Sequence, residues 1–196
     1  AEAGAFVKTK DELDIPNIQF HYAPAMIVDH GRTLLWGTGM SCHSCLLRPK
    51  SRGEVTLASA DPFADPLIDP KFLSHPDDMK DMIDGYKIMM KVLGAEPFSK
   101  YISEHTQRPI DINDDADIEQ AMREGADTVY HPVGTCKMGN DPLSVVDSRL
   151  KVHNMKGLRV VDASIMPTLV GGNTNAPTIM IGEKASDMII EDWNLN

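Results

Sequence analysis

The stretch that decides the fold opens with YHPVGTCKMG at residues 130–139. It continues with LRVVDASIMP at residues 158–167 and closes with GGNTNAP at residues 171–177, after which an apolar run leads to Glu183. Glycine, proline and asparagine recur in these segments and favour turns over long regular elements. We expect the residues before this stretch to form a framework that holds a pocket over it.

Working outward, the residues around these segments predict short extended pieces followed by one long helix. The extended pieces are VVD at 145–147, LKV at 150–152 and LRVV at 158–161. The helix is expected to begin at Pro177, because proline is favoured in the first turn, and to run to about Asp192. Its first residues, TIMIG, are apolar nearly all round, so we expect its N-terminus to be buried.

The first third of the chain predicts strands and loops. Residues 1–16 carry mixed charges and are expected to form a surface segment. Loose apolar alternation predicts strands over 18–28, over 41–47 and around Val55 to Leu57. Three prolines between residues 61 and 70 predict an ordered loop there, since proline breaks helices and central strands.

Three helices are predicted in the middle of the chain. Residues 76–93 place apolar side chains at a period near 3.6, with Pro76 at the start and Gly94 as the stop. A short helix is expected over 96–105, and a strongly acidic surface helix over 114–123. Strands first, helices in the middle and a mixed end indicate an α+β fold, with a mostly antiparallel sheet and helices packed on one face.

Composition narrows the classes of function. The chain of 196 residues has a formal net charge of −10, which argues against nucleic-acid binding and against a polybasic membrane-surface protein. No run approaches a spanning helix, and no secretory signal is visible. We expect one domain over residues 1–196, located in the cytoplasm, either free or peripheral at the inner membrane. No G-x-G-x-x-G motif is present, so the dinucleotide-binding (Rossmann) half is absent from this chain.

Three cysteines leave a second reading open. Cys42 and Cys45 form a C-x-x-C pair around His43, and such a pair can bind metal or do redox chemistry. A zinc site would need Cys136 or a histidine brought in by the fold. Reduced, partly buried thiols explain the same residues, and no metal site is predicted. A third reading is a non-catalytic interaction domain that uses the acidic helix.

Candidate functional residues lie in the deciding stretch itself. Histidine is the usual general base near neutral pH, so His131 could take and return a hydroxyl proton; it could instead cap a strand or donate to a carbonyl. The helix start after Asn173 offers unpaired N–H groups and partial positive charge, unless its own asparagine and water cap it. Asp162 could be an N-cap, a surface acid or an acceptor of hydrogen bonds from a cofactor.

Taken together and in this order, the motifs resemble the C-terminal signature of the glucose–methanol–choline (GMC) family of FAD-dependent oxidoreductases. LRPKSRG at 47–53 and IDP at 68–70 are also similar to that family, and the likeness spans about residues 18–190. It is greatest to the alcohol and choline dehydrogenase branch. The resemblance implies a substrate-binding, C-terminal portion of a longer flavoenzyme.

The resemblance also implies roles for particular residues. His131 falls on the catalytic base, and Asn173 on the second catalytic position, which donates a hydrogen bond to the substrate oxygen. Val129 and Tyr130 fall on positions that line the substrate pocket. The positions that contact FAD are Asp162, Ala163, Asn175, Ala176 and Pro177.

The implied partners are a primary alcohol and a quinone or other electron acceptor, with no nucleic acid. Because the dinucleotide-binding part is missing, the isolated chain is expected to bind FAD poorly and to be inactive. An exposed flavin-facing surface could then pair with another copy. The alternative from another class is a stand-alone thiol or metal-binding module that uses Cys42, His43 and Cys45.

Overall fold

The structure is a computed structural model that describes residues 2–29, 32–33, 35–102 and 109–194. Contacts along the chain divide it into two compact units. Unit 1 contains Ala1–Arg52 and Lys71–Asp127, and unit 2 contains Gly53–Pro70 and Thr128–Asn196. Each unit is described by itself, and the expectation of one domain over the whole chain stays a prediction.

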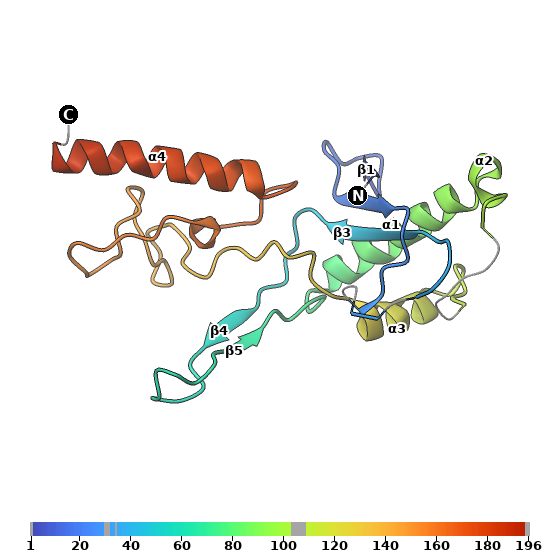
Figure 1. Ribbon diagram of the computed structural model, residues 1–196, viewed down its shortest axis with the longest axis horizontal. Helices are drawn as coiled ribbons and strands as arrows, with labels where there is room; N and C mark the ends of the chain where they lie inside the picture. The colour runs from blue at the N-terminus through green and yellow to red at the C-terminus, as the bar shows by residue number, and fades with distance from the viewer. Residues whose placement is uncertain (1, 30–31, 34, 103–108, 195–196) are drawn as a thin grey trace. The chain divides into compact units, whose positions relative to one another are not determined.

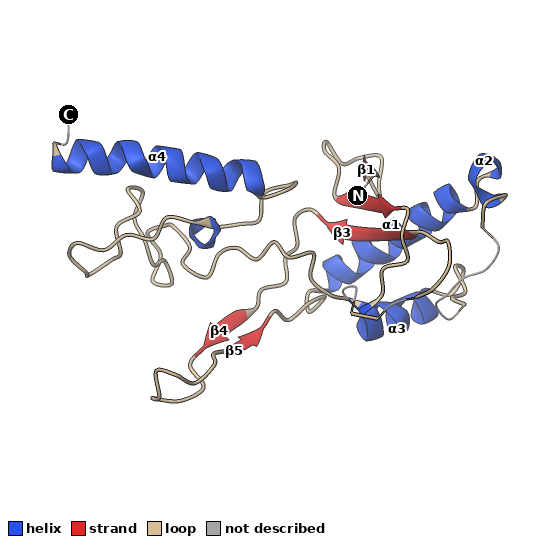
Figure 2. Ribbon diagram, viewed as in Figure 1, coloured by secondary structure: helices blue, strands red, loops and turns tan. Residues whose placement is uncertain are grey.

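Unit 1 contains a three-stranded antiparallel sheet (Figures 1 and 2). Its strands are β1 (Ala3–Val7), β2 (Ile18–Ala23) and β3 (Ser41–Leu46), in the order β1-β2-β3. Because side chains alternate along a strand, Ile18 and Phe20 of β2 share one face of the sheet. Both are buried there.

The long helix α1 (Pro76–Leu93) covers that face. Met89 of α1 joins Ile18 and Phe20 in one apolar cluster. His75 caps the helix, since its Nδ1 accepts a hydrogen bond from the Asp77 N–H at 3.2 Å. A sheet with its helix on one face confirms the predicted α+β class.

Two further helices complete unit 1. The acidic helix α3 (Asp115–Gly125) buries Ile118 against Met79 and Ile83 of α1. The short helix α2 (Glu96–Ser99) occupies the beginning of the segment predicted to be helical over 96–105. Residues 103–105 of that prediction lie outside the described residues.

Unit 2 combines a two-stranded ribbon, a loop-rich segment and one long helix. The ribbon pairs β4 (Glu54–Thr56) with β5 (Leu67–Asp69), and the 3₁₀ helix η2 (Ala163–Ile165) precedes α4 (Asn175–Trp193). One apolar cluster holds the loops against α4. Its buried members are Val146, Leu150, Ile165, Met166, Ile181 and Ala185.

Some local details differ from the predictions. Residues 3–7 are mostly exposed, as expected of a surface segment, but they also form β1 by pairing with β2 through their backbone. Residues 67–69 form β5 between Pro66 and Pro70, which flank the strand without interrupting it. The predicted extended pieces within 145–161 pair through isolated bridges, such as Val146 with Val152 and Lys151 with Arg159. The last helix starts at Asn175, two residues before the predicted Pro177.

Candidate functional site

The residues around His131 form a sharply bent segment. Tyr130 has a φ of 65°, a left-handed conformation that bulky side chains rarely adopt, and its N–H donates to Thr128 Oγ1 at 2.9 Å. Gly134 has a φ of 89°, and a Cβ there would come within 3.3 Å of the Met166 carbonyl oxygen. The chain therefore bends on both sides of His131, which is itself partly buried.

Backbone hydrogen bonds fasten this segment to the one that contains Asp162. The Cys136 N–H donates to the Ser164 carbonyl at 3.0 Å, and the Met138 N–H donates to the Ile165 carbonyl at 2.7 Å. Residues 136–138 are not part of a regular strand, and these backbone hydrogen bonds hold them in place instead. They place residues 136–138 directly beside η2.

Asp162 is the N-cap of η2. Its Oδ1 accepts a hydrogen bond from the Ser164 N–H at 2.7 Å, which is one of the roles that the sequence left open. Ala163, the next residue, is partly buried against the apolar cluster of unit 2. The two residues predicted to contact FAD thus begin a short, well-packed turn.

The start of α4 lies after Asn173. Thr174 is the N-cap and is buried, but its side chain makes no capping hydrogen bond to the helix. Its carbonyl instead accepts from the N–H and the Oγ1 of Thr178, at 3.0 and 2.7 Å. The expectation of a buried helix start was therefore right for Thr174 and wrong for Asn175 and Ala176, which are exposed.

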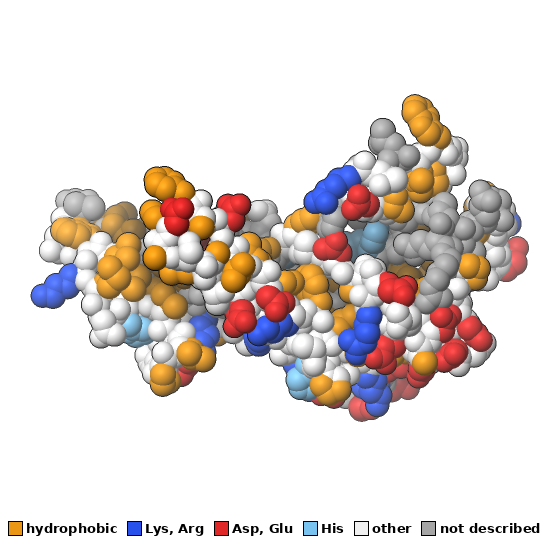
Figure 3. All heavy atoms as spheres, turned by 90° about the horizontal axis from the view of Figure 1, so that it is seen from below, with side chains coloured by type: hydrophobic (Ala, Val, Ile, Leu, Met, Phe, Trp, Pro, Cys, Tyr) orange, Lys and Arg blue, Asp and Glu red, His pale blue; other side chains and the backbone are white. Residues whose placement is uncertain are grey.

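Apolar side chains next to these residues are open to solvent. Tyr130 and Val129 are exposed, as are Ile179 and Met180 in the second turn of α4. Figure 3 shows hydrophobic side chains at several places on the surface of the molecule. An exposed helix start beside apolar side chains is suited to a ligand with a flat, electron-rich ring.

The structure thus brings together the chain segments of His131, Asp162 and α4 within unit 2. Pro177 is partly buried in the first turn of α4, whereas Asn173 is exposed just before the helix. The convergence of the His131 and Asn173 side chains on one oxygen atom stays a prediction.

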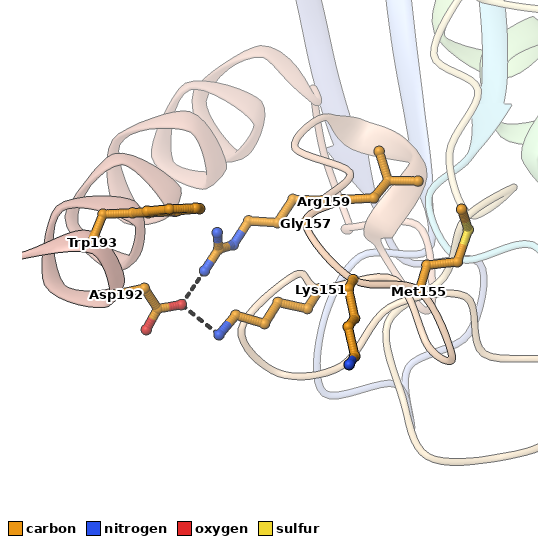
Figure 4. A pocket seen from close by; sticks show the side chains of 8 residues that line it. Lys151, Met155, Gly157, Arg159, Asp192 and Trp193 are labelled. Atoms are coloured by element: carbon orange, nitrogen blue, oxygen red, sulfur yellow. Dashed lines mark hydrogen bonds and ion pairs between the residues drawn. The ribbon is translucent and has the colours of Figure 1, made fainter.

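The other end of α4 carries an ionic cluster that sequence reasoning missed. Lys151 and Arg159 both point to the Asp192 carboxylate (Figure 4). The hydrogen bond from Lys151 is the main cause that lowers the pKa of Asp192 to about 2. Arg149 adds a bond to Asp192 at 2.8 Å and one to the Met188 carbonyl at 3.1 Å. The three cations lie more than thirty residues before Asp192 in the chain, so no local pattern in the sequence pointed to the cluster.

A surface cavity of about 400 Å³ lies beside this cluster. Its lining residues are Lys151, Met155, Lys156, Gly157, Leu158, Arg159, Asp192 and Trp193. Two of its three cations are already paired with Asp192, and its lining includes none of the predicted site residues. We therefore assign the cluster to anchoring α4.

The C-x-x-C pair is split between the two faces of β3. Cys42 packs against the cluster of Ile18, Phe20 and Met89, whereas the Cys45 sulfur lies 3.6 Å from His21 Nε2 on the other face. Burial raises the pKa of each of these two thiols. Two sulfurs on opposite faces of a strand cannot bind one ion without rearrangement.

The described residues contain no group of three or more acidic, histidine or cysteine side chains placed to hold a metal ion. No helix in the described part of the chain is long and apolar enough to cross a membrane.

Comparison with known proteins gives a consistent result. A family model described as GMC oxidoreductase matches residues 49–182. An "alcohol dehydrogenase [acceptor]" of Pseudomonas putida is 50% identical over 190 residues, which are 97% of this chain and 34% of the relative. An oxygen-dependent choline dehydrogenase of Klebsiella pneumoniae is 42% identical over 188 residues, 96% of this chain and 34% of the relative.

A solved structure has the same fold. A formate oxidase from Aspergillus oryzae RIB40, solved to study FAD modification, has a TM-score of 0.83 at 30% identity, covering 92% of this chain and 32% of that one. The chain thus spans about a third of the length of the relatives it matches.

Proposed function

Because the chain belongs to the GMC oxidoreductase family, we propose that it supplies the catalytic base of an FAD-dependent alcohol dehydrogenase and closes one side of the cofactor site. Its relatives include alcohol and choline dehydrogenases, and enzymes of the family are FAD-dependent. The chain lacks a dinucleotide-binding motif and spans about a third of those relatives. We therefore propose that it is part of a longer enzyme and is inactive alone.

One observation carries this proposal. The segment after His131 is fixed beside η2 by the bonds from Cys136 to Ser164 and from Met138 to Ile165. Asp162 begins η2, so the candidate base and a candidate cofactor residue belong to segments that share one hydrogen-bonded framework. A catalytic group needs such a framework, since small errors in position cost large factors in rate.

The residues at the start of α4 fit a flavin. Asn175 and Ala176 are exposed, and the side chain of the N-cap Thr174 leaves their N–H groups to other acceptors. A helix N-terminus stabilises negative charge without reorganisation. Asn175, Ala176 and Pro177 would hold the ring edge on which charge develops, and Asp162 with Ala163 would contact the remainder of the cofactor.

In the proposed reaction His131 removes the hydroxyl proton of a primary alcohol. Asn173 donates a hydrogen bond to the same oxygen and stabilises the charge that develops on it. When bound, FAD supplies the acceptor for the hydride that leaves the alcohol carbon. The alcohol loses one proton to the imidazole and one hydride, so the product is an aldehyde.

The pocket proposal rests on Val129 and Tyr130. Both side chains are exposed and mostly apolar, which favours an aliphatic or aromatic primary alcohol, or choline, over a sugar.

A quinone or another acceptor would reoxidise the cofactor. We also propose a cytoplasmic location, either free or peripheral at the inner membrane, and self-association through the exposed flavin-facing surface.

The test uses the full-length protein. We expect a flavin absorption spectrum that bleaches when a primary alcohol is added without an acceptor. His131→Ala should retain the flavin but slow bleaching by about 10²–10⁴-fold, the usual contribution of a positioned base.

His153→Gln is the matched control, because His153 Nε2 lies 3.0 Å from the Gly139 carbonyl oxygen in the same unit and is not a predicted site residue. It should bleach at the wild-type rate. Unchanged bleaching in His131→Ala would remove this residue from the mechanism, and a full-length protein without flavin would contradict the proposal as a whole.

A further inference from the structure

The β4–β5 ribbon is exposed along its entire length. Every residue from 53 to 70 is exposed, including all three residues of each strand. The exposed fractions of its large apolar side chains are high: Val55 48%, Leu57 86%, Phe63 92%, Leu67 58% and Ile68 70%. Apolar exposure on this scale in one short segment indicates a surface that another part covers.

The ribbon is nevertheless a defined structure. Val55 pairs with Ile68 across the two strands, and Thr56 pairs with Leu67. Gly53 closes the base so tightly that a Cβ there would lie 2.3 Å from the Asp69 carbonyl oxygen. An isolated two-stranded ribbon is at best marginally stable in water. Among the described helices and strands, the extensive contacts of β4 and β5 are with each other.

The identity of the covering part follows from where the ribbon belongs. It is part of unit 2, the unit that also contains the candidate cofactor residues and the exposed Ile179 and Met180 of α4. Unit 1 has its own cores between sheet and helices. The relatives are about three times as long as this chain. A portion of the kind that these relatives have beyond the matched third could cover both open surfaces of unit 2.

We propose that the β4–β5 ribbon is a docking surface for the dinucleotide-binding portion of the longer protein. This inference rests on the proposed function, and it adds the contact by which the two portions are joined. In this arrangement the dinucleotide-binding portion offers an apolar surface to the paired Val55 and Ile68 side chains. Pro66 and Pro70 flank β5, which leaves β4 as the edge better able to accept a further strand.

Hydrogen exchange of residues 54–69 tests the proposal. The amides of β4 and β5 should exchange at least about tenfold more slowly in the full-length protein than in the 196-residue chain, because docking suppresses local opening. The rate in the 196-residue chain should not depend on protein concentration. Equal exchange in the two proteins would overturn the proposal. Protection that rises with the concentration of the 196-residue chain would also overturn it, since a second copy would then be the occupant.

A pair of variants gives an independent measurement. Val55→Thr with Ile68→Thr keeps the β-branched shape that suits a strand but removes apolar surface. It should lower the melting temperature of the full-length protein and leave that of the 196-residue chain unchanged. Leu143→Thr, at another exposed apolar position of unit 2, should change neither. Equal effects of the double variant in both proteins would contradict docking.

The outcomes separate the two proposals. A full-length protein that protects the ribbon but oxidises no alcohol would contradict the proposed reaction and support the docking surface. A full-length protein that oxidises alcohols through His131 while the ribbon amides exchange freely would support the proposed reaction and contradict the docking surface.

Discussion

Lys151 Nζ lies 2.6 Å from Oδ2 of Asp192, which ties the loop-rich part of unit 2 to the last turn of α4. Arg149 and Arg159 bind the same carboxylate. The C-terminal end of a helix carries partial negative charge, so three cations are placed favourably there. The far end of α4 from the candidate cofactor site is therefore fixed by charge, and its middle by the apolar cluster around Ile181.

The ion pairs of Asp192 should make the stability of the folded chain fall as the pH is lowered into the acid range. The pKa of Asp192 falls from an ordinary 3.8 to about 2, chiefly through Lys151, so the folded state holds this carboxylate ionised. A lowered pKa stabilises the folded state above pH 4, and the contribution disappears as the pH falls toward 2. The melting temperature of wild type should exceed that of Asp192→Asn at pH 6, and the difference should shrink steeply as the pH falls to 2.

Asp187→Asn is the control for that measurement. Asp187 is exposed on the same helix, and its substitution should leave the melting temperature nearly unchanged at both pH values. A difference between wild type and Asp192→Asn that is as large at pH 2 as at pH 6 would show that charge is not the cause.

Two adjacent aspartates at the start of α1 should differ sharply in their effect on stability. Asp78 is buried, and its carboxylate accepts hydrogen bonds from the Lys50 and Ser51 N–H groups and from Ser51 Oγ. Asp77 is exposed and pairs with the Lys50 Nζ at 2.5 Å. Asp78→Asn should lower the free energy of unfolding by about 1.5–3 kcal/mol, since it removes the charge from a buried group that accepts several hydrogen bonds.

Asp77→Asn should cost clearly less, because exposed ion pairs contribute little. Urea titration of both variants measures the comparison. Equal losses would mean that the general charge at the helix N-terminus matters, and not the bonds that Asp78 makes to residues 50 and 51.

The sequence predicted the elements that are marked by strong local chemistry. Helix α1 begins at Pro76 and ends before Gly94, as predicted. Its apolar spacing, its acidic first turn and the glycine after its last residue all indicate the same helix boundaries. The strand β1 was missed because its residues from Ala3 to Phe6 are exposed, and backbone pairing with β2 makes them a strand. Nor does composition mark the places where the chain passes between units, near residues 52, 70 and 127.

The candidate site was predictable as a set of motifs and not as a geometry. The cap at Asp162 is a local bond to Ser164, but the placement of the His131 segment beside η2 depends on contacts between segments about thirty residues apart, such as the bond from Met138 to Ile165. Such contacts leave no periodic signal in the sequence. The ionic cluster at Asp192 was missed for the same reason, since its partners lie some forty residues earlier in the chain.

Cys42 and Cys45 should resist forming a disulfide with each other. They lie on opposite faces of β3, and burial raises the pKa of both thiols, which disfavours the reactive thiolate. Mild oxidation of the folded chain followed by peptide mass spectrometry should show no Cys42–Cys45 bridge. The same treatment of the chain unfolded in urea is the control and should form it. A bridge that forms in the folded chain at a comparable rate would contradict the assignment of the two faces.

Two helical glycines should respond to alanine with opposite signs. Gly85 of α1 faces β2, and a Cβ there would lie 3.0 Å from Ile18 Cγ1 and 3.1 Å from its Cδ1. Gly182 of α4 is exposed, and a Cβ there would meet no atom of the described chain within 4 Å. Gly182→Ala should raise the free energy of unfolding by about 0.5–1 kcal/mol, because alanine restricts the unfolded chain and favours helix.

Gly85→Ala gains the same helix preference but must push the buried Ile18 away from α1. Overpacking a core typically costs about 1–3 kcal/mol, so the net change should be a loss. Ile18→Val in the Gly85→Ala background should recover part of that loss, since it removes the Cδ1 methyl that the new Cβ meets. Denaturant unfolding of the two single variants and the double variant decides the matter: a stabilised Gly85→Ala would mean that α1 lies farther from β2 than the structure places it.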